Sequence, residues 1–290
     1  VGKLVAIDTK PLPMPFHNIN AYRLDLTKPV DIIFHENQIN TVCHLAFDFR
    51  ESRDELEVSS IRQNNILGLE NLLKACKMGN VNHFIYMSSH TVYGAHKDNP
   101  VPITENAPLR PLPGFQYSRS KVLSEEMLQQ FAEENPSVTI TILRCCMVMG
   151  PGNDNYVAKA LDQAILVKLT GHDPPLQFIH PHDLVRIVAL FAKEPRAGVF
   201  NLAGDGIVHY SRLAQILGLR MVSLPSFIAY PLIGMSWRLG LQSKARATGL
   251  DLIRYPMVLS TGKLKQATDF KFQYTSEEAI MSYASSKLDL

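Results

Sequence analysis

A tyrosine and a lysine stand four residues apart in the segment YSRSK, as Tyr117 and Lys121. In a helix, this spacing places both side chains on one face, about one turn apart. A neighbouring ammonium group favours the phenolate and would lower the pKa of Tyr117 from its ordinary value of about 10. Such a phenol can give or take the proton of a substrate hydroxyl while hydride moves to or from a nicotinamide. Because such pairs also occur on exposed helix faces, this interpretation needs other residues beside it.

Two serines, Ser88 and Ser89, end the apolar run at the start of MSSHTVYG. Ligands bind at the carboxyl ends of the strands in parallel α/β sheets. Ser89 could therefore donate a hydrogen bond to the substrate oxygen that Tyr117 contacts, and Ser88 is the weaker candidate. The alternative is turn chemistry, because serine is frequent in caps and turns.

An aspartate, Asp8, ends the first apolar run, LVAID. In a nucleotide-binding fold, an acid at this place accepts a hydrogen bond from the adenosine ribose. A carboxylate accepts from a free 2′-hydroxyl and repels a 2′-phosphate, so Asp8 favours NAD over NADP. Lys10 nearby weakens this preference without reversing it. Asp25 in YRLDL could meet the amino group of adenine.

Short apolar runs alternate with helical patterns through the first half of the sequence. The expected strands cover residues 3–8, 21–25, 41–47, 83–88 and 138–144. The expected helices cover residues 28–38, 55–79 and 117–135. Apolar strands separated by helices indicate a parallel sheet that is covered on both faces. We therefore expect an α/β fold with a doubly wound, Rossmann-like parallel sheet.

The pattern is looser after Pro151 and predicts a smaller second part. It contains expected helices at 154–169, 182–193 and 210–217 and an expected strand at 198–204. No linker-like composition separates the two halves. We expect an NAD-binding domain at 1–150 and a substrate-binding part at 151–290, interleaved with the last strands of the sheet.

The composition argues against several other classes of protein. Of the 290 residues, 46% are hydrophobic and 19% are charged, which suits a folded protein with a sizeable core. A formal net charge of +2, without a lysine or arginine run, argues against a nucleic-acid partner. The cysteines show no zinc-type spacing and favour free thiols in a reducing compartment, so we expect a cytoplasmic protein. They are Cys43, Cys76, Cys145 and Cys146.

Ten histidines suggest a metal site, above all in His180-Pro-His182-Asp183. The simpler interpretation is a strand-to-helix junction with Asp183 near the start of the helix. We therefore expect no metal.

The most apolar segment, residues 222–241, is interrupted by Pro225, Pro231 and Arg238, which argues against a membrane-spanning helix. The open alternatives are a core helix, an apolar lid over a substrate pocket, and an amphipathic segment that touches a membrane or a partner.

These segments together resemble the extended short-chain dehydrogenases/reductases of the NAD-dependent epimerase/dehydratase family, which includes UDP-glucose 4-epimerase-like proteins. The YxxxK pair alone would be weak evidence, but the matching elements occur in the right order over almost the whole chain. They are Asp8, Asp25 with Leu26, HLAF (44–47), NNILG (64–68), SSHTVYG (88–94), YSRSK (117–121), LRCCMVMGPG (143–152), FIHPHDLVRIV (178–188) and VFNLAGDG (199–206).

The resemblance implies a role for each matching residue. Tyr117 is the acid/base, Lys121 lowers its pKa and holds the nicotinamide ribose, and Ser89 orients the substrate. The implied cofactor is NAD. The implied cofactor-binding residues are Asp8, Asp25, Leu26, Leu45, Ala46, Phe47, Asn64, Ser88, Tyr117, Lys121 and Cys146. A homodimer formed through helices 55–79 and 117–135 is expected by the same analogy.

The sequence departs from the nucleotide-sugar epimerases at the expected diphosphate ligands. Met147 stands where those enzymes have an asparagine, and Leu176 stands where they have an arginine. Because a diphosphate is bound by guanidinium or amide donors, these departures weaken the case for a UDP-sugar. Cys145, in place of a proline, is a milder change. The possible replacement cations are Arg144, Arg186 and Arg254.

No GxxGxxG motif stands before Asp8 or later in the sequence. We expect that the first strand and its glycine loop are missing, which leaves a gap at the centre of the sheet and weak NAD binding. The first hypothesis is hydride transfer at a secondary alcohol or carbonyl, with a nucleotide-sugar-like substrate. The alternatives are a reductase or dehydrogenase of an apolar, sterol-like substrate, and a non-catalytic binding or regulatory relative.

Overall fold

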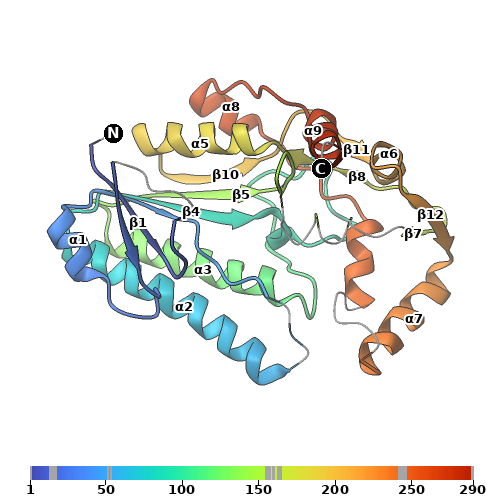
Figure 1. Cartoon of the computed structure of the whole chain (residues 1–290), viewed down its shortest axis with the longest axis horizontal. Coiled ribbons are helices and arrows are strands. Elements are labelled where there is room, and N and C mark those ends of the chain that lie inside the picture. Colours follow the sequence, from blue (N-terminus) through green and yellow to red (C-terminus); the bar gives the residue numbers. More distant parts are fainter. Residues whose placement is uncertain are drawn as a thin grey trace. The chain divides into compact units, whose positions relative to one another are not determined.

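The computed structural model describes residues 2–12, 18–50, 52, 54–153, 158, 161, 165–240 and 247–288. The chain divides into two compact units, each built from several segments (Figure 1). Unit 1 consists of Val1–Met87, Ser120–Ile142 and Ala189–Gly198. Unit 2 consists of Ser88–Arg119, Leu143–Val188 and Val199–Leu290. The division of function at residue 150 stays a prediction.

Parallel strands form the sheets that the apolar runs predict. The larger sheet has the order β10 (Gly198–Leu202), β5 (Thr139–Cys145), β4 (His83–Ser89) and β3 (Thr41–His44). A separate parallel sheet pairs β1 (Leu4–Asp8) with β2 (Ile19–Arg23). Within the described part of the chain, no strand pairing joins β1 to β3.

The central strands are buried on both faces, as their continuous apolar runs predict. In β4, Phe84 and Ile85 point to opposite faces, and neither side chain reaches solvent. Of the seven residues of β5, six are buried. The ends of both strands lie in unit 2, so the strands carry their terminal polar residues there.

Helices cover both faces of these strands, as expected. The helices that alternate with these strands along the chain are α1 (Asp31–Asn37), α2 (Glu55–Met78), α3 (Gln116–Glu134) and α5 (Pro181–Lys193). Within unit 1, α2 and most of α3 lie along one face of the sheet, and the end of α5 lies along the other (Figure 1). Asp54 caps α2 by accepting a hydrogen bond from the amide of Leu56 at 2.9 Å.

The expected helix at 154–169 is wrong at its end, because Ile165–Leu169 forms strand β7. This β-branched segment pairs in parallel with β12 (Arg220–Leu224), a partner far away in the sequence. Of residues 154–164, only Ala158 and Leu161 lie among the described residues, and both are helical.

The remaining elements of unit 2 are short. Strand β6 (Met147–Val148) pairs with β9 (Phe178–Ile179), and β8 (Pro175–Leu176) pairs with β11 (Val208–His209). The helices are η1 (His90–Tyr93), α6 (Tyr210–Ile216), α7 (Ser226–Arg238), η2 (Ala247–Ile253), α8 (Gly262–Thr268) and α9 (Ser276–Leu288). None of the helices in the described ranges is long and apolar enough to cross a membrane.

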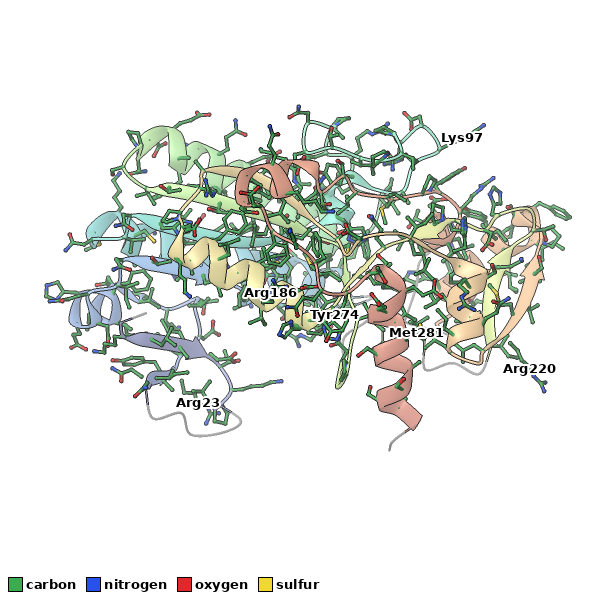
Figure 2. All side chains as sticks on the ribbon, turned by 90° about the horizontal axis from the view of Figure 1, so that it is seen from above. Arg23, Lys97, Arg186, Arg220, Tyr274 and Met281 are labelled. Carbon is green, nitrogen blue, oxygen red and sulfur yellow. The ribbon has the colours of Figure 1, made fainter. Side chains whose placement is uncertain are left out.

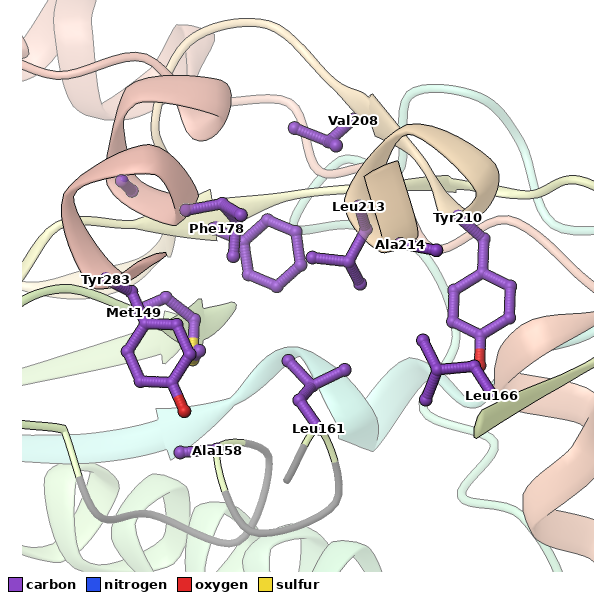
Figure 3. Close-up of a cluster of buried hydrophobic side chains, with 12 residues drawn as sticks. Met149, Ala158, Leu161, Leu166, Phe178, Val208, Tyr210, Leu213, Ala214 and Tyr283 are labelled. Atoms are coloured by element: carbon purple, nitrogen blue, oxygen red, sulfur yellow. The ribbon is translucent and has the colours of Figure 1, made fainter. Parts of the chain in front are cut away.

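A cluster of buried apolar side chains forms the core of unit 2 (Figure 3). Phe178 lies at its centre between Met149 and Leu213, and α6 and α9 close it from the sides. Met147 and Leu176 are half-buried and pack against this cluster.

Candidate functional site

Tyr117 and Lys121 lie on one helix, as their spacing predicts, one turn apart at the start of α3. The boundary between the units falls between them, with Tyr117 in unit 2 and Lys121 in unit 1. The surroundings of each residue therefore come from its own unit.

The Tyr117 hydroxyl is hydrogen-bonded to Ser89, the last residue of β4. The direction of this bond follows from the other partners of Ser89. The Ser89 hydroxyl accepts from the amide of Thr91 at 3.2 Å and from the Thr91 hydroxyl at 3.0 Å. A serine oxygen has two lone pairs and one hydrogen, so Ser89 donates that hydrogen to the Tyr117 oxygen.

Burial raises the pKa of Tyr117 to about 12, although the hydrogen bond from Ser89 acts in the opposite direction. The neighbouring Cys145 thiol adds to the increase. Burial therefore dominates the pKa of Tyr117 in this structure, and the role of Lys121 toward the phenol stays a prediction. At neutral pH the phenol carries its proton and can act as an acid.

Lys121 is buried against the residues at the ends of β3 and β4. Its Nζ donates to the carbonyl oxygen of Met87 at 2.7 Å. The same atom lies 3.8 Å from the ring centroid of Phe47 and 4.7 Å from that of Tyr86. The two aromatic faces attract a cation at this position. The contacts fix the amine at the carboxyl edge of the sheet.

Burial lowers the pKa of Lys121 to about 7, and the Glu125 carboxylate on the next turn opposes that shift. Burial also lowers the pKa of His44, to about 3, and the charge of Lys121 contributes to the decrease. His44 is therefore a neutral neighbour of the amine. Lys121 itself is about half protonated near neutral pH.

An amide inside α2 holds the segment that follows β3. Asn65 accepts from the amide of Asp48 and donates to the carbonyl of Asp48, each at 2.8 Å. This pair of bonds fixes the backbone beside Phe47, whose ring covers Lys121. An amide in an apolar helix is the sequence signal for this role. Thr91, which sets the direction of the Ser89 bond, was missed, although a hydroxyl two residues after a serine is a turn signal.

The two predicted adenosine ligands have exposed carboxylates at the expected places. Asp8 ends β1 and accepts from the amide of Lys10 at 2.8 Å. Asp25 accepts from the amide of Thr27 at 2.9 Å. The carbonyl of Leu26 accepts from Asn71 of α2 at 2.8 Å. Exposed carboxylates such as those of Asp8 and Asp25 can accept from the hydroxyls of a ribose and the amino group of adenine, and these roles toward NAD stay predictions. The sequence has no glycine-rich loop for the pyrophosphate.

The other predicted site residues differ in their surroundings. Leu45 and Ala46 are exposed just after β3, and Asn64 is exposed on α2. Ser88 is buried within β4. Cys146 is buried in unit 2, where its amide donates to the carbonyl of Leu202 at 2.8 Å and burial raises the pKa of its thiol. Their roles toward NAD stay predictions.

The carboxylate of Asp183 has a structural role at the start of α5. It is fully buried and accepts from the backbone amides of Gln273 and Tyr274 and from Arg186 at 2.7 Å. Figure 2 shows Arg186 and Tyr274 close together here, and His180 stacks on the ring of Tyr274. Among the residues that the structure describes, no group of three or more histidine, cysteine or acidic side chains could hold a metal ion.

Comparison with known proteins places these residues in a family. The model of the NAD dependent epimerase/dehydratase family matches residues 3–203. An uncharacterized protein of Mycobacterium bovis is 22% identical over 98% of this chain and 76% of its own length.

Two solved structures share the fold over nearly the whole chain. A UDP-glucose 4-epimerase from Thermotoga maritima, solved with UDP-glucose, matches with a TM-score of 0.77 and 19% identity, over 99% of this chain and 91% of its own. A dTDP-glucose 4,6-dehydratase from Bacillus anthracis, solved with NAD, matches with a TM-score of 0.73 and 14% identity, over 99% of this chain and 88% of its own.

Proposed function

This chain belongs to the NAD-dependent epimerase/dehydratase family, and on that premise we propose that it transfers hydride at a secondary alcohol or carbonyl carbon. The observation that carries the proposal is the chain of hydroxyl groups from Thr91 through Ser89 to Tyr117. In this arrangement Ser89 donates to the phenol oxygen of Tyr117, and a phenol held in this way can exchange its proton with a substrate oxygen.

Tyr117 donates its proton to the substrate oxygen in the direction of reduction and receives it back in the direction of oxidation. Bound NAD supplies the hydride acceptor or donor. The bond from Ser89 stabilises the phenolate that remains after proton donation, since it is a charge-assisted hydrogen bond in that state. Ser89 also orients the oxygen of Tyr117.

Lys121 has two roles in this proposal. Its protonated form stabilises the phenolate one turn away on the same helix. Its ammonium also donates to the hydroxyls of the nicotinamide ribose. The pKa of about 7 means that a small increase in local negative charge is enough to protonate it. Phe47, Met87 and Asn65 keep the amine at this place.

A nucleotide-sugar substrate requires a cationic side chain that can bind its phosphates. Arg144 donates to the Tyr93 hydroxyl at 2.8 Å and to the Glu105 carbonyl at 3.0 Å, and Arg186 is paired with Asp183. Arg254 has a buried Nε without a hydrogen-bond partner among the described residues. We propose Arg254 as the ligand of the phosphates if the substrate is a nucleotide sugar.

An apolar substrate is the second candidate. Met147 and Leu176 replace the usual amide and arginine, and both pack against the apolar cluster of unit 2. A buried apolar side chain adds no donor for a diphosphate and favours an uncharged ligand.

The test is turnover of the full chain with NAD or NADH and two substrate sets, UDP-hexoses and steroid alcohols or ketones. Tyr117→Phe should lower kcat at least about 100-fold, while Tyr22→Phe, which changes a tyrosine on β2, should keep kcat within about twofold. Unchanged turnover in Tyr117→Phe would refute the role of Tyr117. Absence of turnover with every substrate would favour the non-catalytic relative.

The substrate class has a separate readout. If a UDP-hexose is turned over, Arg254→Gln should raise its KM at least about tenfold. The exposed Arg220→Gln on β12 is the control for lost charge and should leave KM unchanged. Turnover of a steroid with equal KM in the wild type and Arg254→Gln would establish the apolar alternative.

A further inference from the structure

Helix α7 (Ser226–Arg238) is apolar on the face that solvent reaches. Phe227 is 79% exposed, and the exposed residues four, eight and twelve positions further on continue the same stripe. This spacing places them along one side of the helix. The exposed members of the stripe are Phe227, Ile228, Pro231, Leu232, Met235 and Leu239.

The opposite face of α7 is already occupied. Ala229 is fully buried and packs with Leu169 and Leu250, and Ile233 lies against the same cluster. An apolar helix with only one covered face is unusual for a protein surface, where large contiguous apolar patches mark interaction sites. The helix therefore has a second apolar face, which the core does not use. A core helix, one of the three alternatives for residues 222–241, accounts only for the covered face of α7.

The exposed side of α7 carries the basic residue Arg238, whereas the acidic Asp251 bonds to Tyr230 on the covered side. Residues 206–250 contain five lysines and arginines and no aspartate or glutamate, in a chain with a net charge of +2. Arg238 ends the helix and is exposed on the side of the apolar stripe. Arg220 is exposed on β12 and extends away from the ribbon (Figure 2). The positive charge of residues 206–250 therefore attracts an anionic surface. The remaining residues of the chain have a net negative charge and would be repelled by such a surface.

We propose that α7 lies on an anionic lipid bilayer, with its exposed apolar stripe in the interface. Aromatic and aliphatic side chains next to arginines are the composition of helices that lie in the plane of a membrane surface. A 13-residue helix is about 20 Å long. It is too short to span a bilayer and long enough to lie on one.

The membrane position of α7 also fits its ends. Pro225 precedes the helix, and Arg238 at the other end reaches the lipid phosphates while the apolar stripe enters the acyl region. A second copy of the chain would bring the same positive charge to the helix, so self-association through this face is disfavoured.

The chain contains one tryptophan, Trp237, and it lies in α7. Its fluorescence reports directly on this helix. The full chain is mixed with vesicles of phosphatidylcholine alone, or with about 30% phosphatidylserine. With the anionic vesicles we expect co-sedimentation, a blue shift of Trp237 emission, and quenching by brominated lipid. With the neutral vesicles, binding should be at least about tenfold weaker.

Three variants test the parts of the surface. Phe227→Glu with Leu232→Glu should weaken binding to anionic vesicles at least about tenfold, and Arg238→Gln should weaken it about fivefold. Val185→Glu with Met78→Glu introduces the same two charges at exposed apolar positions of α5 and α2 and should not change binding. Circular dichroism of each variant confirms that the fold is retained.

Three outcomes would overturn the proposal. The first is failure of the wild type to bind anionic vesicles, and the second is equal binding to both kinds of vesicle. The third is concentration-dependent self-association that the double variant abolishes, because it would show that a second copy covers α7.

Discussion

Replacing Lys121 by methionine should change how the stability of this protein depends on pH. The amine is buried at the end of β4, and burial lowers its pKa from 10.5 to about 7. Methionine has a similar length and no charge, so the variant removes the titration and retains most of the packing against Phe47 and Tyr86.

The sign follows from proton binding in the two states. Between about pH 7 and pH 10.5 the unfolded chain holds a proton on Lys121 that the folded chain has released. Stability therefore rises with pH over this window. Below about pH 7 both states are protonated, and the folded state has the full penalty of a buried charge.

The magnitude follows from the shift. With a folded pKa of about 7, the free energy of unfolding of the wild type should rise by about 2 kcal/mol relative to that of Lys121→Met as the pH goes from about 6 to about 8.5. Urea unfolding at several pH values measures this difference, and taking the difference cancels the groups that titrate alike in both proteins. The window ends below the range in which the buried thiols and Tyr117 would contribute.

Parallel stability curves for the two proteins would refute the reasoning, because Lys121 would then titrate alike in the folded and unfolded states. Lys77→Met removes an exposed lysine of α2 and controls for the change in net charge. The same titration is visible by NMR of lysine labelled at its side-chain carbon, where one amine should titrate near pH 7.

Three further results are expected. Asn65→Ala should lower the free energy of unfolding by about 2 kcal/mol, because two hydrogen bonds are lost. The control, Asn64→Ala at an exposed position, should change it by less than about 0.5 kcal/mol. Equal effects of the two variants in urea unfolding would contradict a stabilising role for the bonds between Asn65 and the backbone of Asp48. Asp183→Ala should cost about 3 kcal/mol, since it removes the buried carboxylate that accepts from two backbone amides and from Arg186, and an unchanged melting temperature would contradict that role. Asp8→Asn should lower the ratio of NAD to NADP affinity about tenfold, measured by calorimetry, and an unchanged ratio would exclude Asp8 from ribose recognition.

Local patterns in the sequence were sufficient for the strands and helices of the first half. The runs at β1, β4 and β5 are mostly apolar and β-branched in part, so local composition and burial favour the same element. The helix α2 begins at a capping aspartate and ends at Gly79, which are local signals. The segment 165–169 was misassigned because its pairing with β12 depends on residues that lie more than 50 positions away in the sequence.

Spacing alone identified Tyr117 and Lys121 as neighbours, since i and i+4 share a face in any α-helix. Their ionisation could not be read from the sequence in the same way. A pKa is set by desolvation and by nearby charges, and both depend on which groups the fold brings together. The burial that raises the pKa of Tyr117 and lowers that of Lys121 comes from strands and loops distant in sequence.

The sequence by itself determined the order of the elements, the residue types at the strand ends and the helical Tyr–Lys pair. Only the tertiary structure decided that Ser89 donates to Tyr117, that Asn65 holds the segment beside Phe47, and that α7 has an apolar face toward solvent. The physical reason is the range of the interactions. Helical periodicity and capping act within a few residues, whereas burial and hydrogen-bond direction depend on every group that the folded chain places nearby.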